Sequence, residues 1–167
     1  MESKQSVKEL FLPADFVMDN AKMRDNLKYL SLLEETERLI LSENLKKFAP
    51  CNIIRTEHIL VFTDQNIYNM KKEQIKRSIP LNSLVGVTKS MLGSKDEFVL
   101  HFEGTHDHRY LVKDTNVRKE IIDVLKRLYA DQFQQNLPIY AVDEKNLKDF
   151  TTVKKLVKQG KSKIPPK

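Results

Sequence analysis

The chain has little of several features that define common protein classes. It has one cysteine, Cys51, among 167 residues, so no internal disulfide forms and a reducing, cytoplasmic compartment is expected. We interpret Cys51 as a spectator thiol, because nothing in the sequence marks it as a nucleophile. The four glycines are scattered, which excludes a glycine-rich phosphate loop. No nucleophile–base set or catalytic carboxylate pair is present, so we predict a protein that is not an enzyme and carries no cofactor.

Long apolar runs are also missing. The longest, such as Phe98–Leu100, fall far short of the roughly 20 residues that a membrane-spanning helix needs. The N-terminus has no apolar signal-peptide core and no arginine-rich transit pattern. Glutamate at position 2 excludes N-myristoylation, and the C-terminal IPPK is not a prenylation box. We therefore expect a soluble protein.

The net charge of +6 is concentrated at one end of the chain. From Glu144 to Lys167 there are eight lysines against two acidic residues, and the preceding residues have equal numbers of basic and acidic groups. This basic tail predicts either a disordered polybasic hook for lipid, nucleic acid or acidic protein, or an extended arm packed on a partner. Its candidate anion-binding residues are Lys154, Lys155, Lys158, Lys161 and Lys163.

Hydrophobic periodicity divides the rest of the chain. Apolar residues near helical spacing predict a helix over 19–33 and another over 117–128. Between them, β-branched and aromatic runs alternate with a turn signal about every ten residues, which is typical of a β-barrel or sandwich. The predicted strands are 37–41, 53–62, 66–70, 75–79, 85–88, 98–102 and 109–112, and 45–50 is predicted as a loop. The predicted boundaries are an N-terminal extension over 1–36, one domain over 37–143 and the tail over 144–167.

Four segments, in this order, resemble the tail homology 1 domain of class I myosins: TDQNIYNM, IKRSIPLNSLVGVTKS, DEFVLHF and KEIIDVLKRLYADQFQQNLPIYAV. FLPADF and the helical stretch before ERLILSENLKKF are similar to the N-terminal extension of that family, so the likeness runs from Leu10 to Val142. It implies an α+β fold, in which about seven antiparallel strands form a pleckstrin-homology-like (PH-like) barrel. A C-terminal helix would close the barrel, and a helical extension would precede it.

The resemblance also implies binding to anionic phospholipids. The phosphoinositide pocket of the family uses basic residues of the first strand, the loop after it and the second strand, which here offer Lys46, Lys47 and Arg55. Glu57 and His58 stand where the family usually has a basic pair, so we expect salt-sensitive binding with little headgroup selectivity. A basic turn is either a second lipid contact or a solvated hairpin tip. Its residues are Lys71, Lys72, Lys76 and Arg77.

A second function from another class stays open. In this alternative the protein is a structural adaptor in a myosin complex or another cytoskeletal assembly, actin-based or microtubule-based as in a cilium. Its lysine tail would then bind an acidic protein surface as part of a larger assembly. The sequence contains no motor domain, light-chain-binding helix or SH3 domain, so we expect a free-standing version of the family's tail domain.

Two further kinds of ligand are disfavoured. Nucleic acid is disfavoured because no predicted strand interleaves basic and aromatic residues on one surface. A metal site would have to come from His101, His106, Asp107 and His108. No cysteine or glutamate completes a convincing set there, so we interpret this stretch as a polar hairpin loop.

Overall fold

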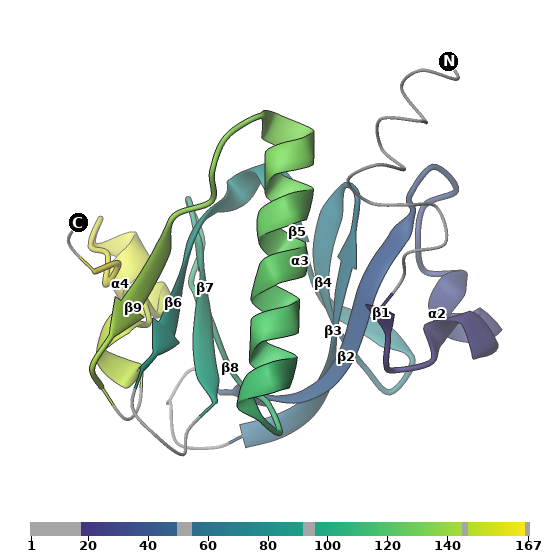
Figure 1. Cartoon of the computed structure of the whole chain (residues 1–167), viewed down its shortest axis with the longest axis horizontal. Coiled ribbons are helices and arrows are strands. Elements are labelled where there is room, and N and C mark those ends of the chain that lie inside the picture. The colour runs from purple at the N-terminus through teal and green to yellow at the C-terminus, as the bar shows by residue number, and fades with distance from the viewer. Residues whose placement is uncertain (1–17, 50–54, 92–95, 145–146, 166–167) are drawn as a thin grey trace. The chain divides into compact units, whose positions relative to one another are not determined.

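The computed structural model describes residues 18–49, 55–91, 96–144 and 147–165 (Figure 1). The prediction made for Cys51 lies outside the described residues. The chain divides into two compact units. Unit 1 comprises Met1–Asn44, His58–Leu81 and Asp123–Asn136, and unit 2 comprises Leu45–Glu57, Asn82–Ile122 and Leu137–Lys167.

Unit 1 is built on antiparallel hairpins whose strands are rich in β-branched and aromatic residues. Its strands follow the order β5-β4-β3-β2, and β1 pairs in parallel with β2. Val61 lies opposite Tyr68 and Phe62 opposite Ile67, which confirms the hairpin predicted around residues 64–65. The bounds are β1 Met18–Asp19, β2 Leu39–Phe48, β3 Arg55–Thr63, β4 Asn66–Lys71 and β5 Gln74–Pro80.

The helix predicted over 19–33 is not continuous. Only the short helices η1 (Met23–Asp25) and α2 (Leu27–Leu30) form there. The Asp19 carboxylate accepts hydrogen bonds from the backbone N–H groups of residues 23 and 24 at 2.8 and 2.9 Å, and side chains of this kind compete with continuous helix. Lys22 has a left-handed φ of 55°, which interrupts a right-handed helix. The expected helical extension is therefore represented, among the described residues, by two separate turns.

The core of unit 1 joins this N-terminal segment to the hairpins. Its buried members are Met23, Tyr29, Leu39, Val61, Tyr68 and Met70, with Leu30, Leu32, Leu33, Ile59 and Ile75 packed against them. Leu27 was predicted to belong to the same apolar stripe, but its side chain is 79% exposed. The apolar spacing of 19–33 therefore does not correspond to one buried helical face.

Unit 2 contains the end of β2 and a second group of strands, in the order β2-β8-β7-β6-β9. The bounds are β6 Leu84–Ser90, β7 Glu97–Phe102, β8 His108–Leu111 and β9 Ile139–Val142, and the short helix η2 is Leu81–Ser83. Lys46 and Lys47 pair with β8, so the loop predicted over 45–50 is wrong: β2 continues to Phe48. The sequence did not indicate a strand here because two lysines, Lys46 and Lys47, interrupt the run of apolar residues.

The sheet has more strands than predicted. The described residues form nine, against about seven expected from the resemblance, and two of the pairings, β1–β2 and β6–β9, are parallel. Figure 1 shows β9 running beside β6. A Cβ atom at Gly86 of β6 would lie 3.0 Å from the ring of Tyr140, so glycine allows β9 this close approach. A strand of two residues, such as β1, is too short to show alternation in a sequence.

The long helix α3 (Thr115–Phe133) confirms the prediction over 117–128 and extends it at both ends. It begins after Asp114, whose carboxylate accepts the backbone N–H of Val117 at 2.9 Å, as an N-cap residue does. Its buried stripe is Val117, Ile121, Val124, Leu125 and Leu128. No helix among the described residues is long and apolar enough to span a membrane.

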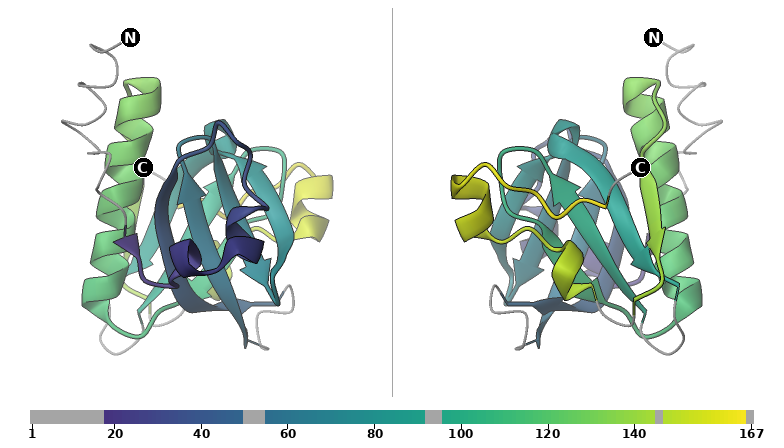
Figure 2. Two further views of the ribbon diagram at one scale, coloured as in Figure 1. Left: turned by 90° about the vertical axis from the view of Figure 1, so that its right-hand side faces the viewer. Right: turned by 90° about the vertical axis from the view of Figure 1, so that its left-hand side faces the viewer.

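The C-terminal segment, residues 147–165, belongs to unit 2 and is bonded to strand β7 and the loop after it. It forms η3 (Lys148–Phe150) and α4 (Lys154–Lys158), which can be followed after β9 in Figure 2. Leu147 is fully buried, and Pro165 is buried at the end of the described chain. The sequence predicted either a disordered polybasic tail or an arm packed on a partner. Neither alternative included packing of this segment against its own chain.

Candidate anion-binding surfaces

The β4–β5 hairpin of unit 1 carries four of the predicted contact residues. Its turn is formed by Lys72 and Glu73, which have left-handed φ values of 51° and 58°. Lys72 and Lys76 are exposed, whereas Lys71 and Arg77 are half-buried. Because β5 alternates, the side chain of Arg77 lies on the opposite face of the strand from that of Lys76. The hairpin therefore presents basic groups at its tip and on both faces.

The N-terminal segment holds this hairpin tip in place. The backbone N–H of Glu73 donates a 2.8 Å hydrogen bond to the Tyr29 hydroxyl, and the Glu73 carboxylate lies 3.3 Å from the Lys28 ammonium. These partners are 44 residues or more apart in the sequence, so no local pattern predicts them. The tip and α2 consequently form one exposed region of unit 1.

A polar cluster stabilises the other end of the hairpin. The Glu37 carboxylate accepts hydrogen bonds from the hydroxyls of Thr63 and Tyr68, and from the Asn66 amide at 3.2 Å. Burial alone raises the pKa of Glu37, but these bonds and the Glu34 backbone N–H outweigh it, so its pKa lies below the usual value. The pKa of the Tyr68 hydroxyl is raised. Burial is the largest cause, and the hydrogen bond to Glu37 is the next largest.

The lowered pKa of Glu37 predicts a pH dependence of stability. Ionised Glu37 stabilises the fold fully above the pKa of the unfolded chain, near 4.5, and this stabilisation is lost as the pH falls through the lower folded pKa. We expect Glu37→Gln to flatten the decline of the urea midpoint between about pH 5 and about pH 3. Glu35→Gln, at an exposed neighbour, is the control, and an equal slope in Glu37→Gln and the unmodified protein would contradict this account.

In unit 2, two of the predicted residues, Lys47 of β2 and Arg55 of β3, lie near Phe48. Lys46 is exposed, and the Lys47 ammonium lies 3.4 Å from the Phe48 carbonyl oxygen. The Arg55 guanidinium is 6.0 Å from the Phe48 ring, and that of Arg109 covers the ring at 3.6 Å. Glu57, two residues after Arg55, is exposed on the same side of β3.

A small hollow in unit 2 brings one of these lysines to the C-terminal segment. Lys47 and Lys154 both line it. Its other lining residues are Phe48, Ala49, His106, Asp107, Arg109, Thr151 and Val153. The structure thus brings together two residues that the sequence had placed in separate candidate groups, one on β2 and one in the tail.

The remaining tail lysines lie on the surface of the folded C-terminal segment. Lys154, Lys155 and Lys158 are exposed on α4 and form no ion pair with another described residue. Lys161 and Lys163 are also exposed, and the backbone N–H of Lys163 is bonded to the Thr152 hydroxyl at 2.7 Å. Their charges are therefore presented from an ordered scaffold.

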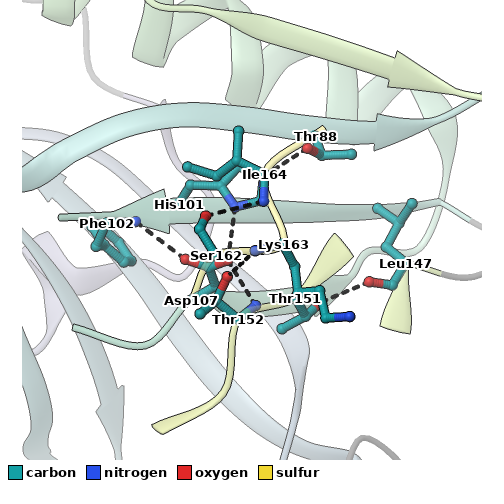
Figure 3. A network of polar contacts seen from close by, with 10 residues as sticks. All are labelled: Thr88, His101, Phe102, Asp107, Leu147, Thr151, Thr152, Ser162, Lys163 and Ile164. Carbon is teal, nitrogen blue, oxygen red and sulfur yellow. Dashed lines mark hydrogen bonds and ion pairs between the residues drawn. The ribbon is translucent and has the colours of Figure 1, made fainter. Parts of the chain in front are cut away.

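A buried network anchors this segment, and sequence reasoning missed it. The Asp107 carboxylate lies 2.7 Å from His101 Nδ1 and accepts the backbone N–H of Thr152 at 2.8 Å (Figure 3). His101 Nε2 lies 2.6 Å from the Thr88 hydroxyl, and the Asp107 backbone N–H donates to the Thr152 carbonyl at 2.8 Å. Asp107 therefore fixes the C-terminal segment to β7 through both its side chain and its backbone.

A buried ion pair provides the second anchor. The Glu97 carboxylate accepts a 2.7 Å bond from Arg109 Nε and a 3.0 Å bond from the backbone N–H of Leu147. The side chains of Glu97 and Arg109 are 2% and 5% exposed. This carboxylate links strand β7 and strand β8 to the start of the C-terminal segment.

These findings correct the interpretation of residues 101–108 as a polar hairpin loop. His101 lies on β7, within the strand predicted over 98–102, and His108 begins β8; both are buried together with Asp107, while His106 is half-buried. Among the described residues, no group of three or more histidine, cysteine, aspartate or glutamate side chains is arranged to hold a metal ion. The buried polar side chains here join parts of the fold.

The strand order and the long helix after β8 define a PH-like domain, and solved structures agree. The hSac2 domain of human phosphoinositide phosphatase Sac2 is similar with a TM-score of 0.56 and 14% identity, over 74% of this chain and 88% of that chain. The Vav1 exchange factor, in a structure of its PH and C1 domains, is similar with a TM-score of 0.51 and 14% identity, over 80% and 38%. At these identities the likeness shows the fold alone.

The sequence model of one family matches residues 4–165, and its description is "Unconventional myosin tail, actin- and lipid-binding". The chain belongs to this family. The match confirms the resemblance drawn from the four sequence segments, and it includes the C-terminal segment as well as the strands. No curated protein sequence matches the chain.

Proposed function

We propose that this protein is a non-catalytic module that docks on anionic phospholipid membranes through exposed basic residues. The observation that carries the proposal is the exposed basic tip of the β4–β5 hairpin, where Lys72 and Lys76 project from a turn that Tyr29 holds in place. A basic residue near an anionic leaflet contributes about 1 kcal/mol. The lipid-binding description of the family supports this function.

Unit 2 carries its own candidate membrane contacts. Lys46, Lys47 and Arg55 supply one group, and the C-terminal segment supplies Lys154, Lys155, Lys158, Lys161 and Lys163. Glu57 lies exposed near Arg55, and His58 is half-buried. A carboxylate beside the arginine weakens a specific phosphate pocket, so we propose salt-sensitive binding with little headgroup selectivity. The protein would be peripheral at the membrane or the cytoskeleton.

A second candidate function is an adaptor on an actin-based assembly. The actin-binding description of the family favours it, together with the exposed lysines of α4. In this function the C-terminal segment would pair with an acidic protein surface. Because the segment is packed on unit 2, charge substitutions test it more cleanly than a truncation, which would also remove the buried Leu147.

Two glycine substitutions in one turn test the membrane function. Lys72→Gly and Glu73→Gly each relieve a left-handed φ, so both variants are expected to be at least as stable as the unmodified protein. They change the charge in opposite directions. We expect Lys72→Gly to lower the affinity for phosphatidylserine-containing vesicles about fivefold and Glu73→Gly to raise it to a similar degree. Vesicle co-sedimentation at low and physiological salt measures both.

Co-sedimentation with actin filaments, measured beside vesicle binding, separates the two candidate functions. A triple change of Lys154, Lys155 and Lys158 to glutamate should abolish co-sedimentation with actin filaments if the C-terminal segment is the docking surface. If the protein docks on membranes through the hairpin, Lys72→Gly and Glu73→Gly should change vesicle binding more than the triple change does. Equal vesicle binding by Lys72→Gly and Glu73→Gly would count against the hairpin as a lipid contact.

A further inference from the structure

One apolar side chain in unit 1 is exposed beside the basic hairpin. Leu27, at the start of α2, is 79% exposed, and the only other large hydrophobic residue exposed to a comparable degree in the described parts of the chain is Met91, at 55%. A single exposed leucine is ordinary in a soluble protein and by itself indicates nothing. Its surroundings decide whether it has a use.

The surroundings of Leu27 are basic. Lys22, Arg24 and Lys28 are exposed in the same short segment, with Asp25 as the one acidic residue among 22–28. The Lys28 ammonium lies 3.3 Å from Glu73, which places α2 directly against the hairpin turn that carries Lys72. An exposed apolar side chain in a basic segment is typical of proteins that lie in the interface of an anionic bilayer.

The backbone that carries Leu27 is held on both sides. The Asn26 side chain accepts the backbone N–H of Lys28 at 3.1 Å, and the ring of Tyr29 is buried in the core of unit 1. The Tyr29 hydroxyl accepts the backbone N–H of Glu73 at 2.8 Å. A side chain presented from a fixed backbone loses less conformational entropy on binding than one on a loose loop.

We infer that Leu27 inserts into the interfacial layer of an anionic membrane, while Lys28 and Lys72 contact the lipid phosphates around it. The inference rests on the proposed membrane function and adds an apolar contact to it. Charge complementarity favours a lipid surface as the occupant, because the leucine is framed by cations and a bilayer supplies apolar chains directly beneath a layer of anions. An apolar pocket on actin is the competing occupant.

Tryptophan fluorescence tests the insertion directly, because the chain contains no tryptophan. Leu27→Trp places one reporter at the site, and Met91→Trp, in unit 2, is the matched control at another exposed apolar position. Both variants are mixed with vesicles of phosphatidylcholine and phosphatidylserine, with and without brominated acyl chains. We expect a blue shift and quenching by the brominated lipid for Leu27→Trp and neither for Met91→Trp.

The possible results of this experiment distinguish a failure of the Leu27 insertion from a failure of the membrane function on which it rests. If Leu27→Trp co-sediments with vesicles but is not quenched, the protein docks by charge alone and the insertion is wrong. Quenching at both positions would show non-specific contact and would also overturn it. If the unmodified protein does not bind vesicles at either salt concentration, the membrane function itself fails, and the insertion fails with it.

The affinity of Leu27→Ala provides an independent measurement. Removing most of an apolar side chain that is buried only in the bound state should weaken vesicle binding roughly tenfold. This loss should persist at about 0.5 M salt, where the contribution of the lysines is screened. The melting temperature should not change, because the side chain is exposed in the free protein. A loss of actin-filament binding with unchanged vesicle binding would assign Leu27 to a protein partner instead.

Discussion

Replacing Glu97 with alanine is expected to lower the free energy of unfolding by about 3–5 kcal/mol, the largest effect that we predict for a single substitution. Arg109 would remain buried, at 5% exposure, without the carboxylate that lies 2.7 Å from its Nε atom. The backbone N–H of Leu147 would lose its 3.0 Å acceptor as well. The ring of Phe48, 3.6 Å from the guanidinium, would remain in contact with it.

Urea denaturation of three variants measures this effect and its cause. Glu103→Ala is the control, because Glu103 is exposed on the β7–β8 loop, and it should change stability by less than about 0.5 kcal/mol. The double variant Glu97→Ala with Arg109→Met should be more stable than Glu97→Ala alone, since it also removes the buried charge that has lost its carboxylate. If the double variant is the less stable of the two, the penalty does not come from the loss of this ion pair.

The second large effect is expected for Asp107→Ala, at about 2–4 kcal/mol of destabilisation. The carboxylate is buried and accepts three bonds, from His101 Nδ1 and from the backbone N–H groups of Thr152 and Phe102. Each buried donor left without an acceptor costs about 1–3 kcal/mol. Because Thr152 in turn holds Lys163, the substitution should also loosen the C-terminal segment.

Hydrogen exchange and limited proteolysis distinguish this loosening from a general loss of stability. We expect protection at the backbone N–H groups of Thr152 and Lys163 to fall first, and trypsin to cleave between Lys154 and Lys163 before it cleaves elsewhere. Asp149→Ala, which changes an exposed aspartate of the same segment, should leave the cleavage pattern as it is. Uniform cleavage along the chain would mean that Asp107 stabilises the whole fold without any particular role in anchoring the segment.

These two anchors also connect stability with the proposed function. The lysines of α4 project from a segment that Glu97 and Asp107 attach to unit 2. A loosened segment keeps its charges but loses their fixed spacing. Binding that depends on general charge would survive Asp107→Ala, whereas docking on a shaped acidic surface would weaken.

The α+β class and the family were determined by the sequence. The strands at 66–70 and 98–102 form because β-branched and aromatic residues alternate with turn residues, and the apolar stripe of 117–128 forms a helix because its spacing matches a helical face. These are local signals, carried by neighbours within a few residues. The ordered segments that resemble the myosin tail family are likewise a property of the sequence, and the family match confirms them.

Other features were decided by the tertiary structure alone. The sequence could not show that Leu27 faces outward, because its spacing from Met23 fits one continuous helix, whereas the extended backbone of Asn26 separates η1 from α2. Nor could it show that the lysine-rich end is packed. The bond between Asp107 and Thr152 spans 45 residues, and that between Glu97 and Leu147 spans 50. Such contacts depend on which strands become neighbours when the core is buried, and no local period of the sequence encodes that choice.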